Sequence, residues 1–436
     1  MKAVFYVLTI FSLLCSTISQ AALLNIAPET VEAEAWTILD PHSGQIIAEH
    51  NSHVQRAPAS MTKMMVAYIA LKEIEAGKLS KSEIITATSV VNMVQWDESQ
   101  MYLKQGEVIS VDQLLAGLIV MSANDAAVTL AERISGSVPA FIKRMNTEAK
   151  ALGMNDTHFS NPAGITMEDH YSSAHDMALL GQAVTMQTPD YLHYSVMPSF
   201  SYNQRFHRAT NLALKFDPSV DGLKTGFTKA AGYNLALTAH RPTFNTNLAE
   251  RRLIVVVMGA KNAVKRAEVA HALIDLAYTY TRNEEIIKGN QIIAELPVIK
   301  STLKMFKVEA QKPKFVTTSL YAQPTAIDLT TYDKVNQRIM TNIGEGMLQA
   351  VAPLTETKTH VDIKLKTQQL LAPMAQVVQL ATINVYQNDQ LINSIGIDQD
   401  VQIEEANFFQ KIGMWFSNLF SFFKASESVV KIYPVN

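Results

Sequence analysis

The sequence predicts a mixed α+β fold: a larger domain that combines a sheet with many helices, followed by a small β-rich domain. Helical and strand-like periodicities are mixed along the chain up to about residue 283. Beyond that point, short β-type runs alternate with polar turns that contain Pro, Asn and Asp. With 436 residues, the chain is long enough for two domains that each bury a core. We expect the domains at residues 22–283 and 284–400, flanked by terminal segments at 1–21 and 401–436.

The larger domain is expected to open with a β-hairpin at residues 35–49, around the turn Asp40-Pro-His-Ser-Gly44. A helix is predicted at residues 60–76, because its apolar positions have helical spacing, Pro58 precedes it and Gly77 ends it. Later runs predict three more helices and two adjacent buried strands, the helices at residues 113–118, 125–134 and 263–280 and the strands at 233–239 and 253–258.

The β-rich domain is predicted from runs with high strand propensity at residues 315–318, 361–365 and 377–385. Polar turns separate these runs, and no catalytic pattern accompanies them. The simplest interpretation is a domain that holds the larger domain at a distance from the C-terminal segment.

The charge balance excludes one class of partner. The formal net charge of −3 arises from 37 basic and 40 acidic side chains without a long basic block, so we expect no nucleic acid partner. Metal catalysis also lacks support, because no two of the eleven histidines lie at ligand spacing with an acidic partner. His158, His170 and His175 are interpreted as structural or surface residues. We expect neither a metal nor another cofactor.

The N-terminus predicts export. Lys2 precedes an apolar run at residues 3–14, and Ser19-Gln20-Ala21 offers small residues for signal-peptide cleavage after Ala21. The run is well short of the ~20 residues that a membrane-spanning helix needs, and an uncleaved anchor is the alternative. The only cysteine, Cys15, lies in this segment. The mature protein would therefore contain no thiol or disulfide, which suits a bacterial periplasm.

The C-terminal segment predicts an amphipathic helix at residues 407–424. Its apolar face recurs at steps of three and four residues and consists of Phe408, Ile412, Trp415, Phe416, Leu419 and Phe423. Such a face suits a helix in the membrane interface, with Lys411 and Lys424 near anionic headgroups. A helix docked on its own domain is the alternative, and residues 425–436 have no interpretation. We therefore expect a peripheral protein on the periplasmic face of the inner membrane.

A candidate nucleophile lies at the start of the helix predicted at residues 60–76. Ser60-Met-Thr-Lys63 places a hydroxyl and an amine about one turn apart on one helix face. An amine can deprotonate a serine if burial or a nearby cation lowers its pKa, and the helix N-terminus offers a backbone N–H to an oxyanion. Alone the pattern has little weight, because about two such spacings are expected by chance. This chain repeats it at Ser301, Ser421 and Ser428.

Two further motifs follow in order. Ser122-Ala-Asn124 lies between an apolar helical run and Asp125, which suits a loop that projects both side chains into a cleft; an N-cap is the alternative. Lys224-Thr-Gly226 precedes the predicted strand pair. An edge strand there could offer backbone groups to an extended peptide while Lys224 attracts a terminal carboxylate; a surface turn is the alternative.

In order and spacing, the three motifs resemble the triplet shared by penicillin-binding proteins and class A β-lactamases. Ser122 follows Ser60 by 62 residues, and Lys224 follows Ser122 by 102. Longer stretches resemble the low-molecular-mass D-alanyl-D-alanine carboxypeptidases: Pro58-Ala-Ser-Met-Thr-Lys-Met-Met65, Ser122-Ala-Asn-Asp-Ala126, Ser172-Ser-Ala-His-Asp-Met-Ala178, Val220-Asp-Gly-Leu-Lys-Thr-Gly226 and Ala231-Gly-Tyr-Asn-Leu235. The resemblance covers nearly the whole mature chain. It implies a penicilloyl-serine-transferase (β-lactamase-like) domain with a central antiparallel sheet, then a β-rich domain and an amphipathic anchor.

The resemblance also implies an activity: a serine carboxypeptidase that removes the terminal D-alanine from peptidoglycan stem pentapeptides and binds penicillin. Ser60 would attack the carbonyl between the two D-alanines, Lys63 would take its proton, and Ser122 would return a proton to the leaving amine. Asn124 would hold the substrate amide and Lys63. Lys224 would attract the substrate carboxylate and keep the Lys63 amine neutral by like-charge repulsion.

The implied substrate-binding residues are Asn124, Lys224, Thr225, Gly226, Phe227 and Arg266. The backbone N–H groups of Ser60 and Phe227 would form the oxyanion hole. Phe227 stands where carboxypeptidases of this type often have histidine, so we expect deacylation or its pH dependence to differ. Arg266 matches an arginine near the carboxylate pocket of the family, and a surface salt bridge is its alternative.

Three other functions stay open. A β-lactamase would need a carboxylate that activates the deacylating water, and no convincing class A glutamate motif lies between Ser122 and Lys224. A DD-endopeptidase would cleave cross-links with the same site. A non-catalytic wall-binding protein has no physical need of Ser60 beside Lys63, so the intact motifs argue against it. The expected partners are the stem peptide, β-lactam antibiotics and the membrane surface.

Overall fold

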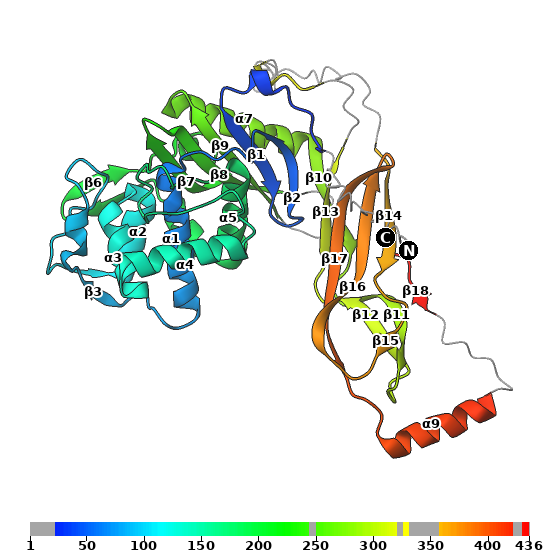
Figure 1. Cartoon of the computed structure of the whole chain (residues 1–436). Helices are drawn as coiled ribbons and strands as arrows, with labels where there is room; N and C mark the ends of the chain where they lie inside the picture. The colour runs from blue at the N-terminus through cyan, green and yellow to red at the C-terminus, as the bar shows by residue number, and fades with distance from the viewer. Residues whose placement is uncertain (1–21, 244–249, 321–325, 331–356, 422–429, 436) are drawn as a thin grey trace, which may run out of the picture.

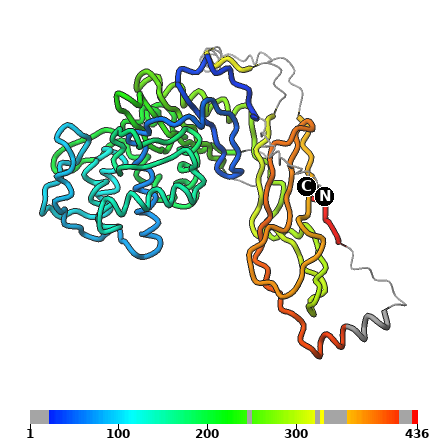
Figure 2. The backbone as a smooth tube through the Cα atoms, in the orientation of Figure 1, coloured from blue at the N-terminus to red at the C-terminus, as the bar shows by residue number. Residues whose placement is uncertain are grey.

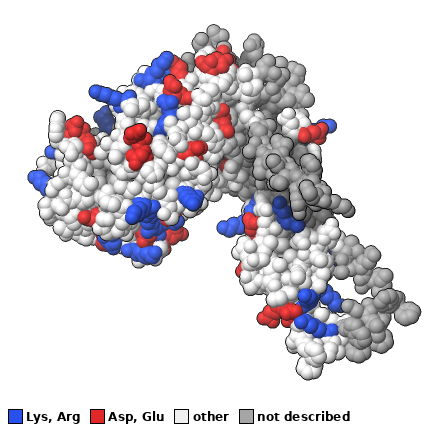
Figure 3. Space-filling model, viewed as in Figure 1, with Lys and Arg blue, Asp and Glu red and all other residues white. Residues whose placement is uncertain are grey.

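The computed structural model describes residues 22–243, 250–320, 326–330, 357–421 and 430–435. The predicted signal peptide, residues 1–21, lies outside them. Figures 1 and 2 show a rounded N-terminal domain beside an elongated β-rich domain, with the last helix set apart from both. On the face seen in Figure 3, basic and acidic side chains of the described residues are interspersed.

A five-stranded antiparallel sheet forms the centre of the N-terminal domain, in the order β2-β1-β9-β8-β7. Its strands are β1 (Ala35–Asp40), β2 (Gln45–His50), β7 (Val220–Thr228), β8 (Gly232–Pro242) and β9 (Glu250–Ala260). The predicted hairpin and strand pair are both present, and the strand that carries Lys224-Thr-Gly226 is an edge strand. The mixed fold with a central antiparallel sheet is confirmed.

Helices cover both faces of this sheet (Figure 1). One face is covered by α5 (Ala174–Gln187) and the cluster behind it: α1 (Lys63–Glu75), α2 (Val111–Ala116), α3 (Asn124–Ser135), α4 (Val138–Ala151) and α6 (Tyr191–Ser195). The other face is covered by α7 (Ala263–Tyr280). Alternation along β9 explains the two layers, since Ile254 and Val256 are buried toward the first cluster whereas Val255 and Val257 are buried toward α7.

The short elements described in this domain include two hairpins and four 3₁₀ turns. The hairpins are β3 (Ile84–Thr86) with β4 (Val108–Ser110), and β5 (Ser199–Tyr202) with β6 (Arg205–Arg208). The 3₁₀ turns are Pro28–Thr30, Ala59–Thr62, Ser89–Met93 and Leu212–Lys215.

Two predicted helices differ in detail from the structure. The one expected at residues 60–76 starts as the 3₁₀ turn Ala59–Thr62 and becomes α-helical only at Lys63. The one expected at 113–118 starts earlier, because Ser110 and Gln113 form a capping box, and it continues into a π turn at Gly117–Met121. Both irregular turns lie where sequence motifs begin or end.

The β-rich domain consists of small sheets: β10 pairs with β13, β11 lies between β12 and β15, and β16 lies between β14 and β17. The strands are β10 (Thr281–Ile287), β11 (Gln291–Ile299), β12 (Met305–Ala310), β13 (Lys314–Ser319), β14 (Thr359–Leu365), β15 (Leu370–Leu371), β16 (Met374–Gln387) and β17 (Gln390–Ile403). Asn388 and Asp389, both with positive φ, make the tight turn between β16 and β17. The predicted boundary at residue 283 falls within β10, and β17 extends past residue 400.

Buried polar contacts join the two domains. The Gln45 side-chain amide donates to the carbonyls of Thr317 and Ile392 at 3.1 and 3.2 Å, and its oxygen accepts the Thr317 N–H at 2.7 Å. Nearby, Arg251 pairs with Asp40 at 2.8 Å and also donates to the Thr281 carbonyl. The tip of the β1–β2 hairpin is thereby bonded to strands of the β-rich domain.

The C-terminal helix α9 (Phe408–Ser421) extends away from the β-rich domain (Figure 1). Phe408 and Phe409 are 70% and 81% exposed. Of the predicted apolar face, Ile412 is also exposed, only the backbone of Trp415, Phe416 and Leu419 is described, and Phe423 lies outside the described residues. Within the described part of the chain, no helix is both long and apolar enough to cross a membrane.

The tail, which the sequence left without an interpretation, returns to the β-rich domain. Its strand β18 (Lys431–Ile432) pairs antiparallel with Ala294 and Glu295 of β11. The Tyr433 N–H donates to the Ile293 carbonyl at 2.9 Å. Lys431 also lies 3.5 Å from a carboxylate oxygen of Glu295.

Candidate active site

Ser60 and Lys63 meet at the start of α1. The turn that contains Ser60 is a 3₁₀ turn, in which residues three apart lie one above the other. The Lys63 amine therefore lies 3.2 Å from the Ser60 hydroxyl oxygen. Ser60 is half-buried, whereas Lys63 is fully buried. This geometry places a base beside a nucleophile.

The surroundings of Lys63 favour a neutral amine. Burial lowers its pKa well below the usual value of 10.5, and the positive charge of Lys224 lowers it further. Glu98 and Asp125 act in the opposite direction with smaller effect. The repulsion predicted from the sequence is present, but desolvation is the larger cause.

A loop that the sequence analysis did not single out completes the surroundings of Lys63. The Lys63 amine donates to the Ala163 carbonyl. Asn161 shapes this loop, since its side-chain oxygen accepts the backbone N–H groups of Ala163, Gly164 and Ile165. Gly164 has φ +85°, and a Cβ there would lie 2.0 Å from the Ala59 carbonyl oxygen. The Asn-Pro-Ala-Gly sequence, typical of a turn, was the only available signal.

Thr62 is held by the same region. Its hydroxyl lies 2.9 Å from Nε2 of His170, whose Nδ1 accepts the Ser160 N–H. Burial lowers the pKa of His170 to about 4, so the ring is neutral near pH 7. His170 is therefore a structural residue behind the nucleophile turn.

The Ser122-Ala-Asn124 motif lies between the π turn and α3. Ser122 adopts left-handed backbone geometry with φ 60°, and its buried hydroxyl has no hydrogen-bond partner among the described residues. The N-cap alternative is wrong, because Ala123 is the N-cap residue of α3 and no side chain caps that helix. Asn124 was expected to contact Lys63; its amide nitrogen instead donates to Glu98 at 2.6 Å.

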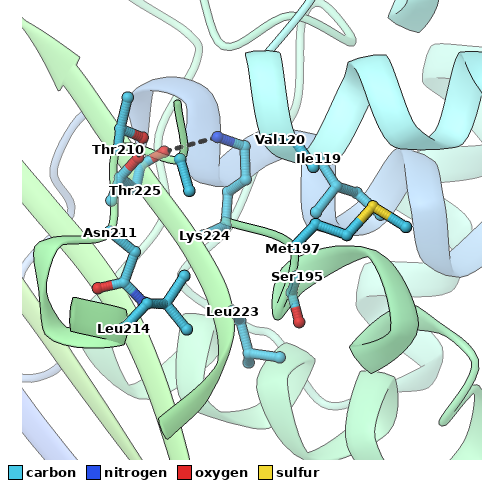
Figure 4. A pocket seen from close by; sticks show the side chains of 11 residues that line it. Ile119, Val120, Ser195, Met197, Thr210, Asn211, Leu214, Leu223, Lys224 and Thr225 are labelled. Atoms are coloured by element: carbon cyan, nitrogen blue, oxygen red, sulfur yellow. Dashed lines mark hydrogen bonds between the residues drawn. The ribbon is translucent and has the colours of Figure 1, made fainter. Parts of the chain in front are cut away.

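The Lys224-Thr-Gly226 motif lies on edge strand β7, and its surface-turn alternative is wrong. Lys224 is only 2% exposed, and its amine donates to the Thr225 carbonyl at 3.2 Å. Burial lowers its pKa to about 7, with a further contribution from the charge of Arg266. Figure 4 shows Lys224 beside a small pocket lined by Ile119, Val120, Met197, Thr210, Asn211, Leu214 and Thr225, among others.

Gly226 allows β7 to approach the nucleophile turn. A Cβ on Gly226 would lie 2.8 Å from the Pro58 carbonyl oxygen and 3.1 Å from the Ser60 backbone nitrogen. Any side chain at this position would push the strand and the turn apart. The next residue, Phe227, is half-exposed and packs its ring 4.3 Å from that of Tyr233.

Arg266 lies behind this strand and is 4% exposed. Its guanidinium donates to the backbone carbonyls of Thr210, Gly226 and Asn234 at 3.1 to 3.4 Å. The alternative of a surface salt bridge is wrong, because burial excludes it and the bonds go to backbone. Burial lowers the pKa of Arg266 to about 10, so it remains a cation near pH 7.

Fold and site together define a class: a serine hydrolase in which a buried lysine lies beside the nucleophile, on a domain with helices on both faces of an antiparallel sheet. The family model described as D-alanyl-D-alanine carboxypeptidase, peptidase S11, matches residues 22–262. That range is more than half of the chain, which therefore belongs to this family of serine peptidases.

Named relatives extend the similarity along the chain. The D-alanyl-D-alanine carboxypeptidase DacD of Salmonella typhimurium is 30% identical over 96% of this chain and 98% of its own length. The carboxypeptidase DacF of Bacillus subtilis is 30% identical over 86% of this chain and 87% of its own. The predicted carboxypeptidase function is confirmed at the level of the family.

The similarity to solved structures extends into the β-rich domain. Penicillin-binding protein 5 from Haemophilus influenzae matches with a TM-score of 0.69 at 27% identity, covering 87% of this chain and 100% of its own. Ampicillin-bound penicillin-binding protein D2 from Listeria monocytogenes matches at 30% identity with a TM-score of 0.50, covering 57% of this chain and 98% of its own. The chain is thus similar to one penicillin-binding protein over most of its length and to another over 57% of it.

Proposed function

We propose that Ser60 is the nucleophile with which this chain removes the terminal D-alanine from peptidoglycan stem pentapeptides. The observation that carries the proposal is the buried Lys63 amine, 3.2 Å from the Ser60 hydroxyl oxygen and with a strongly lowered pKa. A neutral amine at that distance can accept the serine proton as the oxygen attacks.

In the first half-reaction, Ser60 Oγ bonds to the carbonyl carbon between the two D-alanines and its proton passes to Lys63. The backbone N–H groups of Ser60 and Phe227 stabilise the oxyanion. The bond between the carbonyl carbon and the amide nitrogen then breaks. Ser122 passes its proton to the leaving amine, and Lys63 returns a proton to Ser122. Water hydrolyses the ester in the second half-reaction, which releases the shortened peptide and restores Ser60.

The positive charges on one side of the cleft favour a substrate that ends in a carboxylate. Lys224 lies on β7 beside the nucleophile turn, and Arg266 lies behind that strand. A terminal D-alanine brings a carboxylate to this position, whereas the cross-link cut by an endopeptidase need not do so. Carboxypeptidase activity is therefore favoured over the DD-endopeptidase alternative, and Asn124 and Thr225 would bind the peptide on either side of the scissile bond.

The test is intact-protein mass spectrometry with benzylpenicillin and with a diacetyl-Lys-D-Ala-D-Ala peptide, on wild type and on Ser60→Ala. We expect a covalent penicillin adduct and release of one D-alanine with wild type only, because Ser60→Ala removes the attacking oxygen and lowers the rate at least about a thousandfold. An adduct without D-alanine release would favour the endopeptidase or wall-binding alternatives. The absence of any adduct would exclude Ser60 as nucleophile.

We further propose that residues 1–21 are removed on export and that α9 binds the periplasmic surface of the inner membrane. The exposed rings of Phe408 and Phe409 support this, because the free energy of an aromatic helix face is lower at the membrane interface than in water. Co-sedimentation of the mature protein with anionic vesicles tests it. We expect binding to fall at least about tenfold in Phe408→Asp/Ile412→Asp with D-alanine release unchanged, and equal binding would reject the anchor.

A further inference from the structure

A loop at residues 98–103 is bonded closely to the Ser122-Ala-Asn124 motif. The Asn124 backbone N–H donates to the Ser99 carbonyl at 2.7 Å. The two carboxylate oxygens of Asp125 accept the N–H groups of Met101 and Leu103, each at 2.9 Å. These bonds hold the loop in one position against the cleft.

Glu98 is the first residue of this loop and the one whose carboxylate contacts the motif. One of its oxygens accepts the Asn124 amide at 2.6 Å, and the side chain is half-buried. Asp125 is different, because backbone N–H groups engage both its oxygens. Among the described residues, no basic side chain forms an ion pair with Glu98 within 4.0 Å, although Lys63 is close enough for its pKa to respond.

Charges of opposite sign therefore lie beside the Lys224-Thr-Gly226 motif and beside Asn124. Lys224 and Arg266 are at the β7 side, where the proposed function places the terminal carboxylate of the substrate. Glu98 is at the Asn124 side, where the residues that precede the two D-alanines would lie. A carboxylate held at a binding cleft with no cation of its own is a receptor for a cation that the ligand supplies.

We propose that Glu98 is a specificity-determining residue that binds a side-chain ammonium on the residue preceding D-alanyl-D-alanine. The inference rests on the proposed function and assigns a residue to it: the Glu98 carboxylate would distinguish a third residue with a free side-chain amine from one whose amine is blocked. Asn124 positions Glu98, and the second carboxylate oxygen receives the ammonium.

The test compares two peptides that differ only in that charge, Nα-acetyl-Lys-D-Ala-D-Ala and Nα,Nε-diacetyl-Lys-D-Ala-D-Ala. The measured quantity is the ratio of their kcat/KM values for D-alanine release. We expect wild type to prefer the free amine about fivefold, the size typical of a partly exposed ion pair. Because both peptides react with the same Ser60 and Lys63, the ratio cancels any effect of Glu98 on the base.

Two variants distinguish an effect of the Glu98 charge from an effect of the loop as a whole. Glu98→Gln retains an oxygen that accepts the Asn124 amide but removes the negative charge, so the ratio should fall to about one. Asp97→Asn removes the same charge from the exposed neighbouring residue, and its ratio should stay at about five.

A wild-type ratio near one, or a preference that persists in Glu98→Gln, would overturn the inference. Equal loss of the preference in both variants would also overturn it, because the loop charge as a whole would then be responsible. Failure to hydrolyse either peptide would instead overturn the proposed carboxypeptidase function, and the inference with it.

Discussion

The two domains differ in the charged side chains that they bury. The cleft of the N-terminal domain buries three basic side chains, Lys63, Lys224 and Arg266, at 0%, 2% and 4% exposure, and none has an ion-pair partner among the described residues. In the described β-rich domain, the buried polar side chains are all uncharged: Thr281, Asn283, Ser301, Thr317, Thr318, Ser319, Asn384, Gln387 and Gln399.

The difference shows that the free energy of unfolding is lowered at the site where the reaction requires buried basic groups. An unpaired buried charge costs several kcal/mol, so it persists only where another requirement maintains it. Burial alone does not explain why the cleft residues lack ion-pair partners, since the same N-terminal domain buries Arg251 with Asp40 as its partner. We therefore expect substitutions in the cleft to change activity more than stability, and substitutions in the β-rich core to do the opposite.

The largest effect is expected on the rate of acylation, in the variant Gly226→Val. The new side chain would separate β7 from the Ser60 N–H and disturb the proposed oxyanion hole, so acylation by benzylpenicillin should slow about 10²- to 10³-fold. Stopped-flow or quenched-flow mass spectrometry measures this rate. Gly289→Val, at a loop in the β-rich domain, is the matched control and should acylate like wild type. A slowing of less than about tenfold in Gly226→Val would contradict the geometry.

A smaller effect, on stability alone, is expected from Ile383→Ala. Ile383 is fully buried in β16, so its truncation should destabilise the β-rich domain by about 2–3 kcal/mol. Hydrogen exchange of peptides from β16 and β17 measures the loss, while D-alanine release should remain within about twofold of wild type. A large drop in activity would show that the two domains are energetically coupled, against the comparison drawn above.

The smallest change in stability is expected from Lys224→Met, and it is a gain. Burial and Arg266 lower the pKa of Lys224 from 10.5 to about 7, so between these pH values the unfolded chain binds a proton that the folded chain has released. Wild-type stability thus rises with pH across this range. At pH 7 the variant should be about 1–2 kcal/mol more stable and inactive, and its advantage should shrink as pH approaches 10.5. Urea unfolding at several pH values checks this; a destabilised variant at pH 7 would refute it.

The sequence predicted those parts of the site that lie in short motifs. Ser60 and Lys63 are three residues apart, so one helical turn brings them together whatever the rest of the fold does. The edge strand that carries Lys224 was likewise readable, because the strand pair that follows it has a clear apolar pattern. Order and spacing then linked the motifs.

The sequence did not predict the contacts between distant segments. Asn161 and Glu98 contact the site through loops with no periodicity, and their roles depend on side-chain bonds to backbone or to Asn124 that no local pattern encodes. The burial of Arg266 was equally hidden, because only the packing of α7 on the sheet excludes it from solvent. At residues 430–436 the apolar residues are Val430, Ile432, Tyr433 and Val435, but Pro434 interrupts this short run, so no strand was predicted there.

The return of the tail has a mechanical consequence. The chain leaves the β-rich domain after Ala406, whose N–H donates to the Lys300 carbonyl, and pairs with the domain again at Lys431. The helix α9 therefore belongs to a segment that begins and ends on the same domain. A force applied to α9 would enter the domain at β17 on one side and at β11 on the other. The load would be shared between two strands, and rotation of the helix about a single tether would be restricted.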